Sequence, residues 1–563
     1  MLMGEEEARA RLIGPGLPFE IEEVAIRGVP TRVWKNAPAS LRAVFLAAEA
    51  YGEREFIVYR DERWSFARHN AAVRRLAHRL VAHYGILPGD RIAIAMRNLP
   101  EWCIAFWAAT SIGAIAVPLN GWWTGEELEY GLADSGAVLA VLDHERWLRI
   151  VPHLSALDLR GFIVARATEP LAAPAETWDE VLAAAPEEAA LPEADIAPED
   201  DATIFYTSGT TGFPKGAVGS HRNICSNLFS TGFAGALRLL RQGGLPAALG
   251  GEPVVSSALL SVPLFHATGC HSTMLPLFAG GGKLVLMYRW DPEQAIALIE
   301  AEAVTGFGGV PGMVWQVLES PSFHDGLLKS VQGIGYGGAP SAPELVRRID
   351  RGFPGAEPRN GYGLTETSSI TTLIGGADYR ARPDSVGRPV PVCEVKVVDG
   401  EGESLPPGGI GELWIKGPNV VRGYWGKPEA TAETFSDGWL HSGDIGRMDA
   451  EGFVYILDRA KDMLIRGGEN VYCVEVEDAL YSHPGVMDAA VIGRPHHILG
   501  EEVVAVVQAA PGVEVSEDEL IAHCRAHIAS FKVPVTVEIR SEPLPRNANG
   551  KILKPQLKNE LFG

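Results

Sequence analysis

Short apolar runs alternate with longer amphipathic stretches from about residue 90 onward. The apolar runs at 91–95, 137–142 and 202–206 have the length expected of strands, and helical patterns lie between them. Strands that alternate with helices pair mainly in parallel, because each crossover returns the chain to the same end of the sheet. The pattern therefore predicts an α/β fold for the large N-terminal part of the chain.

The end of the chain has a different character. Valine-rich runs at 489–492 and 503–507 precede Ser516 and Glu519, which have the spacing of a helix capping box. The helical face that follows carries Leu520, Ile521, Cys524, His527 and Ile528. These features predict a compact α+β unit, joined to the α/β part near residues 458–461.

The longest uncharged apolar run, 102–119, approaches the minimum length of a membrane-spanning helix. Gly113 interrupts it and Pro118 lies near its end, so a buried helix followed by a buried strand is the better interpretation. The N-terminal residues are acidic and lack the apolar segment of a signal peptide. We expect no transmembrane segment and a cytoplasmic protein, in agreement with six cysteines that include no CxxC pair.

Acidic residues outnumber basic ones and limit the partners of the protein. Lys and Arg total 49, Asp and Glu total 71, and the formal net charge is −22. This balance disfavours general binding to nucleic acid and gives little attraction to an anionic membrane. An anionic substrate must therefore be held by a local arrangement of hydrogen-bond donors and cations.

One glycine-rich string has the composition of such an arrangement. A Pro- and Ala-rich stretch at 167–198 is predicted to be a surface connection, and the string YTSGTTGFPKG follows at 206–216. Its glycines allow main-chain N–H groups to turn toward an anion, its hydroxyls can donate hydrogen bonds, and Lys215 adds a positive charge. Gly216 follows this lysine where a Walker loop has Ser or Thr, so the string indicates another type of phosphate loop.

Five further motifs follow in a fixed order. They are NGYGLTET at 360–367, GELWIKGPNVVRGYW at 411–425, WLHSGD at 439–444, LDRAKDMLIRGGENVYCVEVE at 457–477 and PRNANGKILK at 545–554. With the glycine-rich string, they make the chain similar to the adenylate-forming superfamily, which contains AMP-binding acyl-CoA synthetases, non-ribosomal adenylation domains and beetle luciferases. The resemblance extends over roughly residues 40–554.

The resemblance implies a particular architecture and activity. The expected fold is α/β, with a large domain at 1–458, made of two α/β subdomains and a distorted β-barrel, and a small mobile α+β lid at 459–563. The expected reaction is ATP-dependent ligation of a carboxylic acid to coenzyme A, through acyl-AMP and with Mg²⁺. A medium- or long-chain fatty acid is the expected substrate. An aryl or other bulky acid, or transfer to a carrier protein, stays open, as do a homodimer and peripheral membrane contact.

The motifs assign the chemistry of this reaction to particular residues. In acyl-AMP formation a carboxylate attacks a phosphate, and two anions repel, so a bridging positive charge is needed. The resemblance gives this role to Lys551, makes Glu366 the Mg²⁺ ligand and places Thr210 in the phosphate loop. His266 resembles an aromatic gate between the nucleotide and acyl sites. Lys551, Thr210, Glu366 and His266 are therefore the expected catalytic residues.

The nucleotide is expected to contact several further segments. By resemblance, Asp444 accepts hydrogen bonds from the ribose, Arg459 contacts the same sugar, Tyr362 stacks on adenine and Asn360 bonds its amino edge. The other expected ATP or AMP contacts are Thr207, Ser208, Gly209, Thr211, Gly212, Lys215, Gly338, Ala339, Pro340, Gly361, Gly363, Thr365 and Ile456, with Lys551 completing the set.

Thioester formation requires a second arrangement of the small domain. By resemblance, Lys461 is the hinge residue, and a rotation there brings a coenzyme A loop to the acyl carbonyl. This loop consists of Arg466, Gly467, Gly468 and Glu469. Cys473 stands where related sequences very often have proline, which puts the local rigidity of this segment in question.

The acid is expected to bind next to the gate. By resemblance, the acyl pocket is expected to consist of His266, Gly309, Val310, Pro311, Gly335 and Gly337. Its small residues favour room for a long or bulky acyl group. The string HATGCH also places His266, Cys270 and His271 close together as a zinc-like set, but it has no nearby fourth ligand, and we do not expect zinc.

Overall fold

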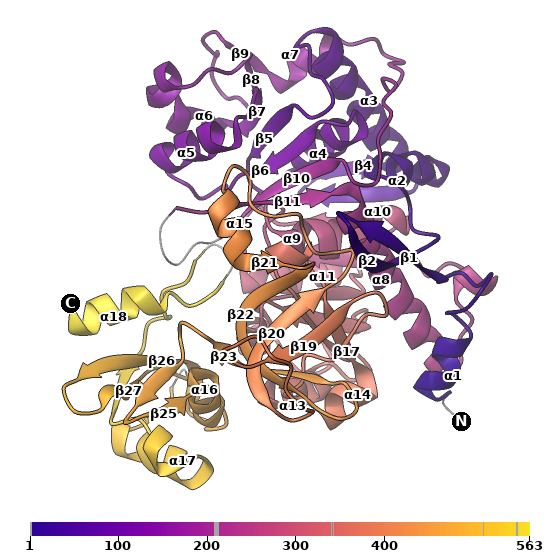
Figure 1. The fold of residues 1–563 in the computed structure, drawn as a ribbon. Helices are drawn as coiled ribbons and strands as arrows, with labels where there is room; N and C mark the ends of the chain where they lie inside the picture. The colour runs from indigo at the N-terminus through magenta and orange to yellow at the C-terminus, as the bar shows by residue number, and fades with distance from the viewer. Residues whose placement is uncertain (1–2, 208–212, 339–340, 342, 511, 548–549) are drawn as a thin grey trace.

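The computed structural model describes residues 3–207, 213–338, 341, 343–510, 512–547 and 550–563. Among these residues, the N-terminal part forms sheets of seven, nine and five strands, and the C-terminal part forms a further sheet of five. Figure 1 shows the C-terminal part, coloured orange to yellow, as a small domain beside the large one. The expected fold class, a large mixed domain with a small α+β domain, is confirmed.

The seven-stranded sheet has a parallel centre and helices on both faces. Its strands, in order across the sheet, are β11 (Gly216–Ser220), β10 (Asp201–Tyr206), β6 (Ile115–Pro118), β5 (Arg91–Ala95), β7 (Leu139–Asp143), β8 (Phe162–Ala165) and β9 (Ala175–Thr177). Its helices are α3 (Phe66–Ala82), α4 (Pro100–Ser111), α5 (Gly125–Ser135), α6 (His144–Ile150) and α7 (Trp178–Ala183). Alternate residues of β5 point to opposite faces, so Ile92 and Ile94 pack with α3 and α4. Ala93 and Ala95 pack with α5 and α6.

This sheet tests several expectations from the hydrophobic pattern. The strand expected at 91–95 is β5, and the apolar run at 102–119 forms α4 and β6, both buried, as predicted. The expectation of a plain surface connection at 167–198 is wrong, because this stretch contains β9 and α7. Trp178 and Val181 of α7 are buried against α3 and β8. Of the helices in the described residues, none combines the length and apolarity that crossing a bilayer requires.

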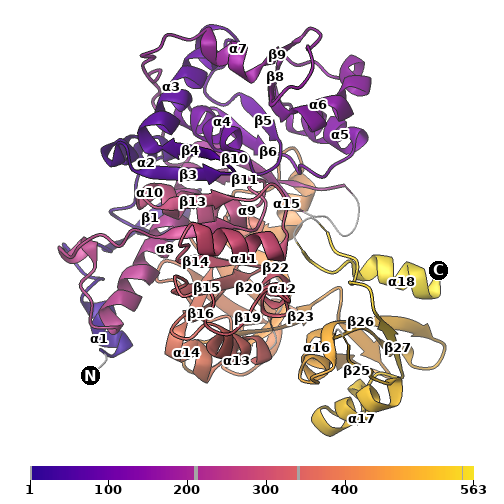
Figure 2. The same ribbon diagram turned by 180° about the vertical axis from the view of Figure 1, so that it is seen from behind.

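The nine-stranded sheet forms the second α/β layer. Its strands, in order, are β18 (Arg388–Pro389), β17 (Thr372–Gly375), β16 (Glu357–Tyr362), β15 (Gly333–Gly337), β14 (Gly306–Gly309), β12 (Ser257–Leu260), β13 (Lys283–Leu286), β3 (Glu55–Tyr59) and β4 (Glu62–Ser65). Its helices are α2 (Leu41–Ala47), α8 (His221–Arg241), α10 (Leu275–Ala279), α11 (Pro292–Ala301), α12 (Pro311–Leu318), α13 (Pro343–Gly352) and α14 (Gly376–Ala381). Figure 2 shows α11 and α12 in front of this sheet. The inner strands are parallel, and their carboxyl ends carry the motif residues at 335–338 and 360–363.

A five-stranded antiparallel sheet completes the large domain. It contains β19 (Glu394–Val398), β20 (Ile410–Lys416), β21 (Phe435–Ser436), β22 (Trp439–Met448) and β23 (Val454–Arg459), with α15 (Pro428–Thr434) beside it. The register between β22 and β23 places Asp444 directly opposite Arg459. Two residues from different motifs are therefore cross-strand neighbours.

The small domain begins immediately after this sheet. Its strands are β24 (Leu464–Arg466), β25 (Glu469–Val471), β26 (Val486–His496), β27 (Gly500–Ala509) and β28 (Thr536–Arg540). Its helices are α16 (Cys473–Tyr481), α17 (Glu517–His527) and α18 (Lys554–Phe562). The capping box of Ser516 and Glu519 is present as predicted, and Leu520 and Cys524 of α17 are buried in the core. His527 is exposed, because the helix ends there.

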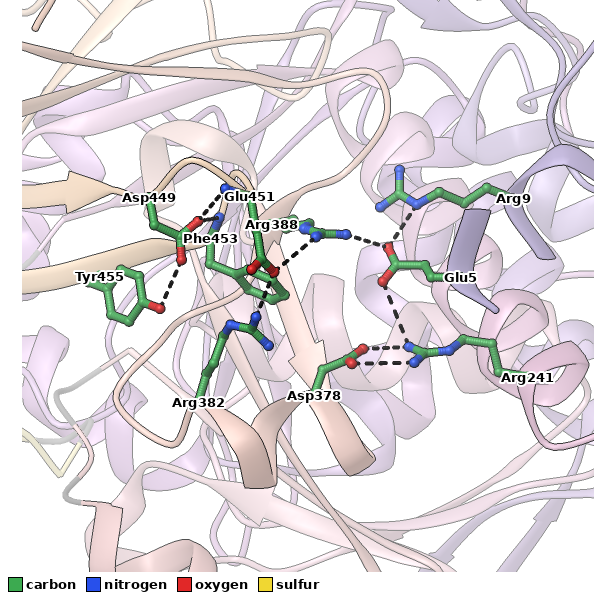
Figure 3. A network of polar contacts seen from close by, with 10 residues as sticks. All are labelled: Glu5, Arg9, Arg241, Asp378, Arg382, Arg388, Asp449, Glu451, Phe453 and Tyr455. Carbon is green, nitrogen blue, oxygen red and sulfur yellow. Dashed lines mark hydrogen bonds and ion pairs between the residues drawn. The ribbon is translucent and has the colours of Figure 1, made fainter. Parts of the chain in front are cut away.

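A polar network fastens the N-terminal segment to the large domain (Figure 3). Helix α1 (Glu5–Ala10) carries Glu5, whose carboxylate lies 3.3 Å from Arg388 and 3.8 Å from Arg241. Arg241 also pairs with Asp378 of α14, and Arg388 lies over the Phe453 ring at 4.3 Å. The network thus joins α1, α8, α14 and the turn before β23. A two-stranded sheet, β1 (Ile21–Ile26) with β2 (Val29–Trp34), follows α1.

Candidate active site

The phosphate loop connects two neighbouring strands. Strand β10 ends at Tyr206, whose hydroxyl donates to Asp134 at 2.8 Å, and the N–H of Thr207 donates to the carbonyl of Lys215 at 2.9 Å. The Lys215 ammonium lies 4.7 Å from the centre of the Tyr424 ring. The loop therefore begins at the end of β10 and ends at the start of β11, its antiparallel neighbour at the edge of the sheet. The expected residues Ser208, Gly209, Thr210, Thr211 and Gly212, and also Ala339 and Pro340, lie outside the described residues.

Asp444 is the buried acid of the site. Its Oδ2 accepts a hydrogen bond from the Tyr362 hydroxyl at 2.6 Å, and its Oδ1 lies 2.7 Å from Nε of Arg459. Its exposed fraction is 3%. The structure thus brings together three expected nucleotide contacts, from β16, β22 and β23. Because these strands belong to two sheets, only the packing of the sheets creates this cluster.

Glu366 lies on a single helical turn after β16. Its Oε1 accepts a hydrogen bond from the Tyr424 hydroxyl at 2.7 Å, and its main-chain carbonyl accepts from the N–H of Val421 at 2.9 Å. Tyr424 is a residue that the sequence analysis missed, although it lies within the motif at 411–425. It joins the acid Glu366 to the phosphate-loop lysine Lys215, which lies over its ring. A cation over an aromatic face is a favourable contact.

Lys551 of the small domain reaches this cluster. Desolvation and the neighbouring cations Arg459 and Lys461 lower the pKa of Lys551 to about 8, against the opposing effect of Asp444 and Glu366. Its main-chain N–H donates to the Asn547 side-chain oxygen at 3.0 Å. Asn547 was not predicted, although it lies in the PRNANG string beside the lysine. The structure therefore combines the expected catalytic lysine with the large-domain acids.

His266 also lies within the electrostatic influence of Lys551. Desolvation, together with the charge of Lys551, lowers the pKa of His266 to about 3, so the imidazole is neutral at physiological pH. The residue caps the short helix at 267–269, and its ring lies 5.1 Å from that of Phe265. A neutral, largely desolvated ring near a lysine and beside Phe265 is compatible with the predicted gate.

The remaining expected nucleotide contacts surround Tyr362. Asn360 and Gly361 lie on β16, and the Asn360 amide donates to the Tyr379 hydroxyl at 3.3 Å. Ile456 packs on the same apolar cluster as Tyr362. The other three are Gly338, which follows β15, Gly363, which follows β16, and Thr365, which begins the turn that carries Glu366.

The loop at 466–469, which is expected to bind coenzyme A, contacts its own domain. Gly467, Gly468 and Glu469 are exposed, and the Arg466 guanidinium donates to the Phe531 carbonyl at 3.2 Å within the small domain. Desolvation and the nearby Arg459 lower the pKa of Lys461, the expected hinge, which lies between the site and this loop. Of the two small-domain elements expected to act in catalysis, only Lys551 is brought to the acids and to His266.

The acyl segments show why glycine occupies two of their positions. A methyl group on Gly337 would lie 2.3 Å from the carbonyl oxygen of Gly361, and one on Gly309 would lie 2.8 Å from Ser261. Glycine is required there by close packing, so these two residues do not indicate a roomy pocket. Gly335 alone of the three faces open space. Val310 and Pro311 follow β14 at the start of α12.

The HATGCH string forms no metal centre in the structure. His271 is buried with its Nδ1 3.0 Å from the carbonyl of Ser368, and Cys270 is fully buried. Across the part of the chain that the structure describes, no group of three or more His, Cys, Asp or Glu side chains could hold a metal ion. The six cysteines are free and buried.

The fold and the order of the motifs are those of AMP-binding enzymes, and the chain belongs to the AMP-binding enzyme family. The family model matches residues 44–425, and the model of the AMP-binding enzyme C-terminal domain matches residues 475–551.

Two curated relatives cover nearly the whole chain. A feruloyl-CoA synthase of Amycolatopsis is 37% identical over 504 residues, which is 89% of this chain and 94% of that protein. The long-chain-fatty-acid–CoA ligase FadD13 of Mycobacterium tuberculosis is 34% identical over 500 residues, with coverages of 89% and 93%.

A solved structure of similar fold covers nearly the whole chain. ATP-bound MatB of Rhodopseudomonas palustris is 29% identical, covers 93% of this chain and 98% of its own, and superposes with a TM-score of 0.80. The apo form of the same protein superposes with a TM-score of 0.72. The chain therefore superposes better on the ATP-bound form than on the apo form.

Proposed function

We propose that this protein is an AMP-forming acid–thiol ligase that converts a carboxylic acid, ATP and coenzyme A into an acyl-CoA thioester. The observation that carries the proposal is that Lys551 of the small domain lies near Asp444 and Glu366 of the large domain, whose charges act on its ammonium. The charge of Lys551 acts in turn on His266. The acyl-CoA synthetase relatives support the same reaction.

In the first half-reaction, the acid attacks the α-phosphate of ATP and pyrophosphate leaves. The Lys551 ammonium neutralises the repulsion between the attacking carboxylate and the phosphate, and it gains most in the transition state, where the negative charge is shared. Asp444 and Arg459 hold the ribose end, so that the α-phosphate is fixed relative to Lys551. His266 stays neutral and separates the acyl group from water.

Glu366 suits a magnesium ion that arrives with ATP. Mg²⁺ is bound in such sites by one or two carboxylates together with phosphate oxygens and water, so one acid is sufficient. Glu366 has its Oε1 hydrogen-bonded to Tyr424, which fixes the orientation of the carboxylate. When bound, the ion would screen the phosphate charges of ATP.

In the second half-reaction, the small domain adopts another orientation. The loop at 466–469 is exposed, whereas Lys551 occupies the site, so one arrangement cannot serve both steps. The proposal includes a division between residues 1–458 and 459–563 and a rotation at Lys461. Gly467 and Gly468 have positive φ angles of 62° and 89° and lack side chains, which suits close approach by a thin pantetheine arm.

The acid is proposed to be a medium- or long-chain fatty acid. The alternative is an aryl acid, which the similarity to a feruloyl-CoA synthase favours. A pocket lined by Pro263, Phe265 and Met313 adjoins the expected acyl segments, and Arg97 and Trp122 close its other side. The free cysteines fit a reducing cytoplasm.

The test is pyrophosphate release from Mg-ATP across a panel of acids, from acetate to oleate and including benzoate, cinnamate and ferulate. Each acid is assayed with and without coenzyme A, and thioester formation is measured in parallel. Release that depends on one acid class, with thioester appearing only with coenzyme A, is expected. Release with no thioester would contradict the acceptor assignment, and no release with any acid would contradict the proposed reaction.

A further inference from the structure

Asp458 lies at the last point of the large domain before the expected hinge. It belongs to β23, where it is paired with Ile445 of β22, so it is held in the five-stranded sheet. Its exposed fraction is 3%. Its two carboxylate oxygens accept hydrogen bonds from main-chain N–H groups, Oδ1 from Arg459 at 2.8 Å and Oδ2 from Cys473 at 2.5 Å.

The second of these bonds crosses the hinge. Cys473 is the first residue of α16, a helix of the small domain, and the preceding Tyr472 provides no side-chain cap. The thiol of Cys473 donates to the Asp462 carbonyl at 3.1 Å. Asp458 therefore caps α16 from outside the small domain, and a carboxylate at a helix N-terminus is a favourable partner for the first N–H groups.

This bond depends on the residue that stands at position 473. Proline has no N–H, and proline is common at the first position of a helix, where the N–H is otherwise unpaired. The cysteine in this chain provides the donor that proline at the same position would lack. Tyr472 has φ −81° and ψ 115°, the extended conformation that a following proline also requires. The two residues are therefore interchangeable in backbone shape but not in hydrogen bonding.

Because Asp458 is buried, loss of its hydrogen bond from Cys473 would destabilise the present arrangement. Burial raises the pKa of Asp458 to about 6, while Lys554 and the two N–H groups oppose this shift. Lys554 begins α18 and pairs with Glu477 of α16 at 2.7 Å. The carboxylate is thus largely ionised at neutral pH, and it relies on the N–H of Cys473 for part of the solvation that it has lost.

We propose that Asp458 is a positioning residue, whose hydrogen bond to the N–H of Cys473 holds the small domain in the arrangement that places Lys551 at the site. The inference rests on the proposed function with its two arrangements. Rotation about Lys461 carries α16 away from β23, so this bond breaks before thioester formation. It therefore sets the balance between the two half-reactions without touching either substrate.

The test compares two substitutions at one position. Cys473→Pro removes the N–H and puts the ring Cδ in its place, so the Asp458 carboxylate must also turn away, whereas Cys473→Ala keeps the N–H and removes only the thiol. We expect Cys473→Pro to slow acyl-AMP formation by about tenfold, as for the loss of one charge-assisted hydrogen bond, and to leave thioester formation from supplied acyl-AMP unchanged or faster. Cys473→Ala is expected to behave as the wild type in both assays.

A second pair of variants tests the acceptor. Asp458→Ala removes the acceptor and is expected to repeat the Cys473→Pro result. Asp458→Asn keeps one oxygen that can accept from the N–H of Cys473, but its NH2 group then faces the N–H of Arg459, so this variant is expected to recover part of the lost rate. Equal slowing of both half-reactions, or none, in Cys473→Pro would overturn the inference. Absence of acyl-AMP formation by the wild type would instead overturn the proposed function, so the two failures are distinguishable.

Discussion

The segment that carries Lys551 and the loop at 466–469 belong to the same small domain but have opposite environments. Lys551 is desolvated among Asp444, Glu366 and His266 of the large domain, whereas Gly467, Gly468 and Glu469 are exposed. Both segments are attached to one sheet and cannot exchange places without moving that sheet. The difference indicates that the structure is arranged for acyl-AMP formation, and that thioester formation needs a different domain orientation.

The largest loss of activity is expected from a substitution of Lys551. Lys551→Ala removes the positive charge between the acid and the α-phosphate, and loss of one such preorganised group typically costs about 10²–10³-fold in rate. Acyl-AMP formation is therefore expected to fall by about this factor, measured as acid-dependent pyrophosphate exchange. Thioester formation from supplied acyl-AMP should persist. If Lys551→Ala slowed acyl-AMP formation and thioester formation equally, the assignment of Lys551 to the first step alone would be wrong.

The pH dependence of acyl-AMP formation is a second test of the role of Lys551. Because the pKa of Lys551 is lowered to about 8 in the unliganded protein, its charge is present below pH 8 and is lost as the pH rises. The kcat/KM for acyl-AMP formation, which reports the free enzyme, is expected to fall by up to about tenfold per pH unit above 8. Lys551→Arg keeps its charge over this range and serves as the control for other titrating groups. A profile that is flat from pH 7 to 10 would contradict the assignment.

The exposed loop is expected to show the reverse pattern. Gly468 has a φ of 89°, and an added methyl group would meet no atom within 4 Å, so alanine there introduces backbone strain without a clash in the present arrangement. Gly468→Ala is expected to slow thioester formation by about tenfold, because the added methyl group would occupy the space proposed for the pantetheine arm. Acyl-AMP formation should be unchanged. Gly400, which is also free of neighbours but has no positive φ, offers the matched control Gly400→Ala.

A smaller effect is expected at Tyr424. Tyr424→Phe removes the hydrogen bond to Glu366 but keeps the aromatic ring beneath Lys215. A single hydrogen bond of this kind contributes about 1 kcal/mol, which corresponds to about a fivefold rise in the Mg²⁺ concentration needed for half-maximal acyl-AMP formation. The measurement is a Mg²⁺ titration at constant ATP. An unchanged titration would show that Tyr424 does not orient the acid.

The local pattern of the sequence predicted several elements of the fold correctly. The strand at 91–95, the buried helix and strand of the 102–119 run and the capping box at Ser516 are all formed. Each depends on neighbours a few residues away. The prediction of a surface connection at 167–198 was wrong. Trp178 and Val181 in this stretch are buried by contact with α3 and β8, and no local pattern reveals those contacts.

The candidate site was predicted largely from its motifs. Asp444, Arg459, Tyr362 and Glu366 were named in advance and lie together, but their mutual bonds were not foreseen. Tyr424 and Asn547 were missed, although each lies inside a quoted motif. The small size of Gly309 and Gly337 was read as room for substrate, whereas neighbouring chain segments approach too closely for any side chain.

The residues of the sequence therefore determined which groups are available for chemistry: a lysine near the C-terminus, acids in two motifs and a glycine-rich loop between two strands. The tertiary structure decided which of these groups meet. Strand register places Asp444 opposite Arg459, and domain packing brings Lys551 beside His266 while the loop at 466–469 is exposed. The physical reason is that side-chain type is a local property, whereas desolvation and charge neighbours arise only when distant segments pack together.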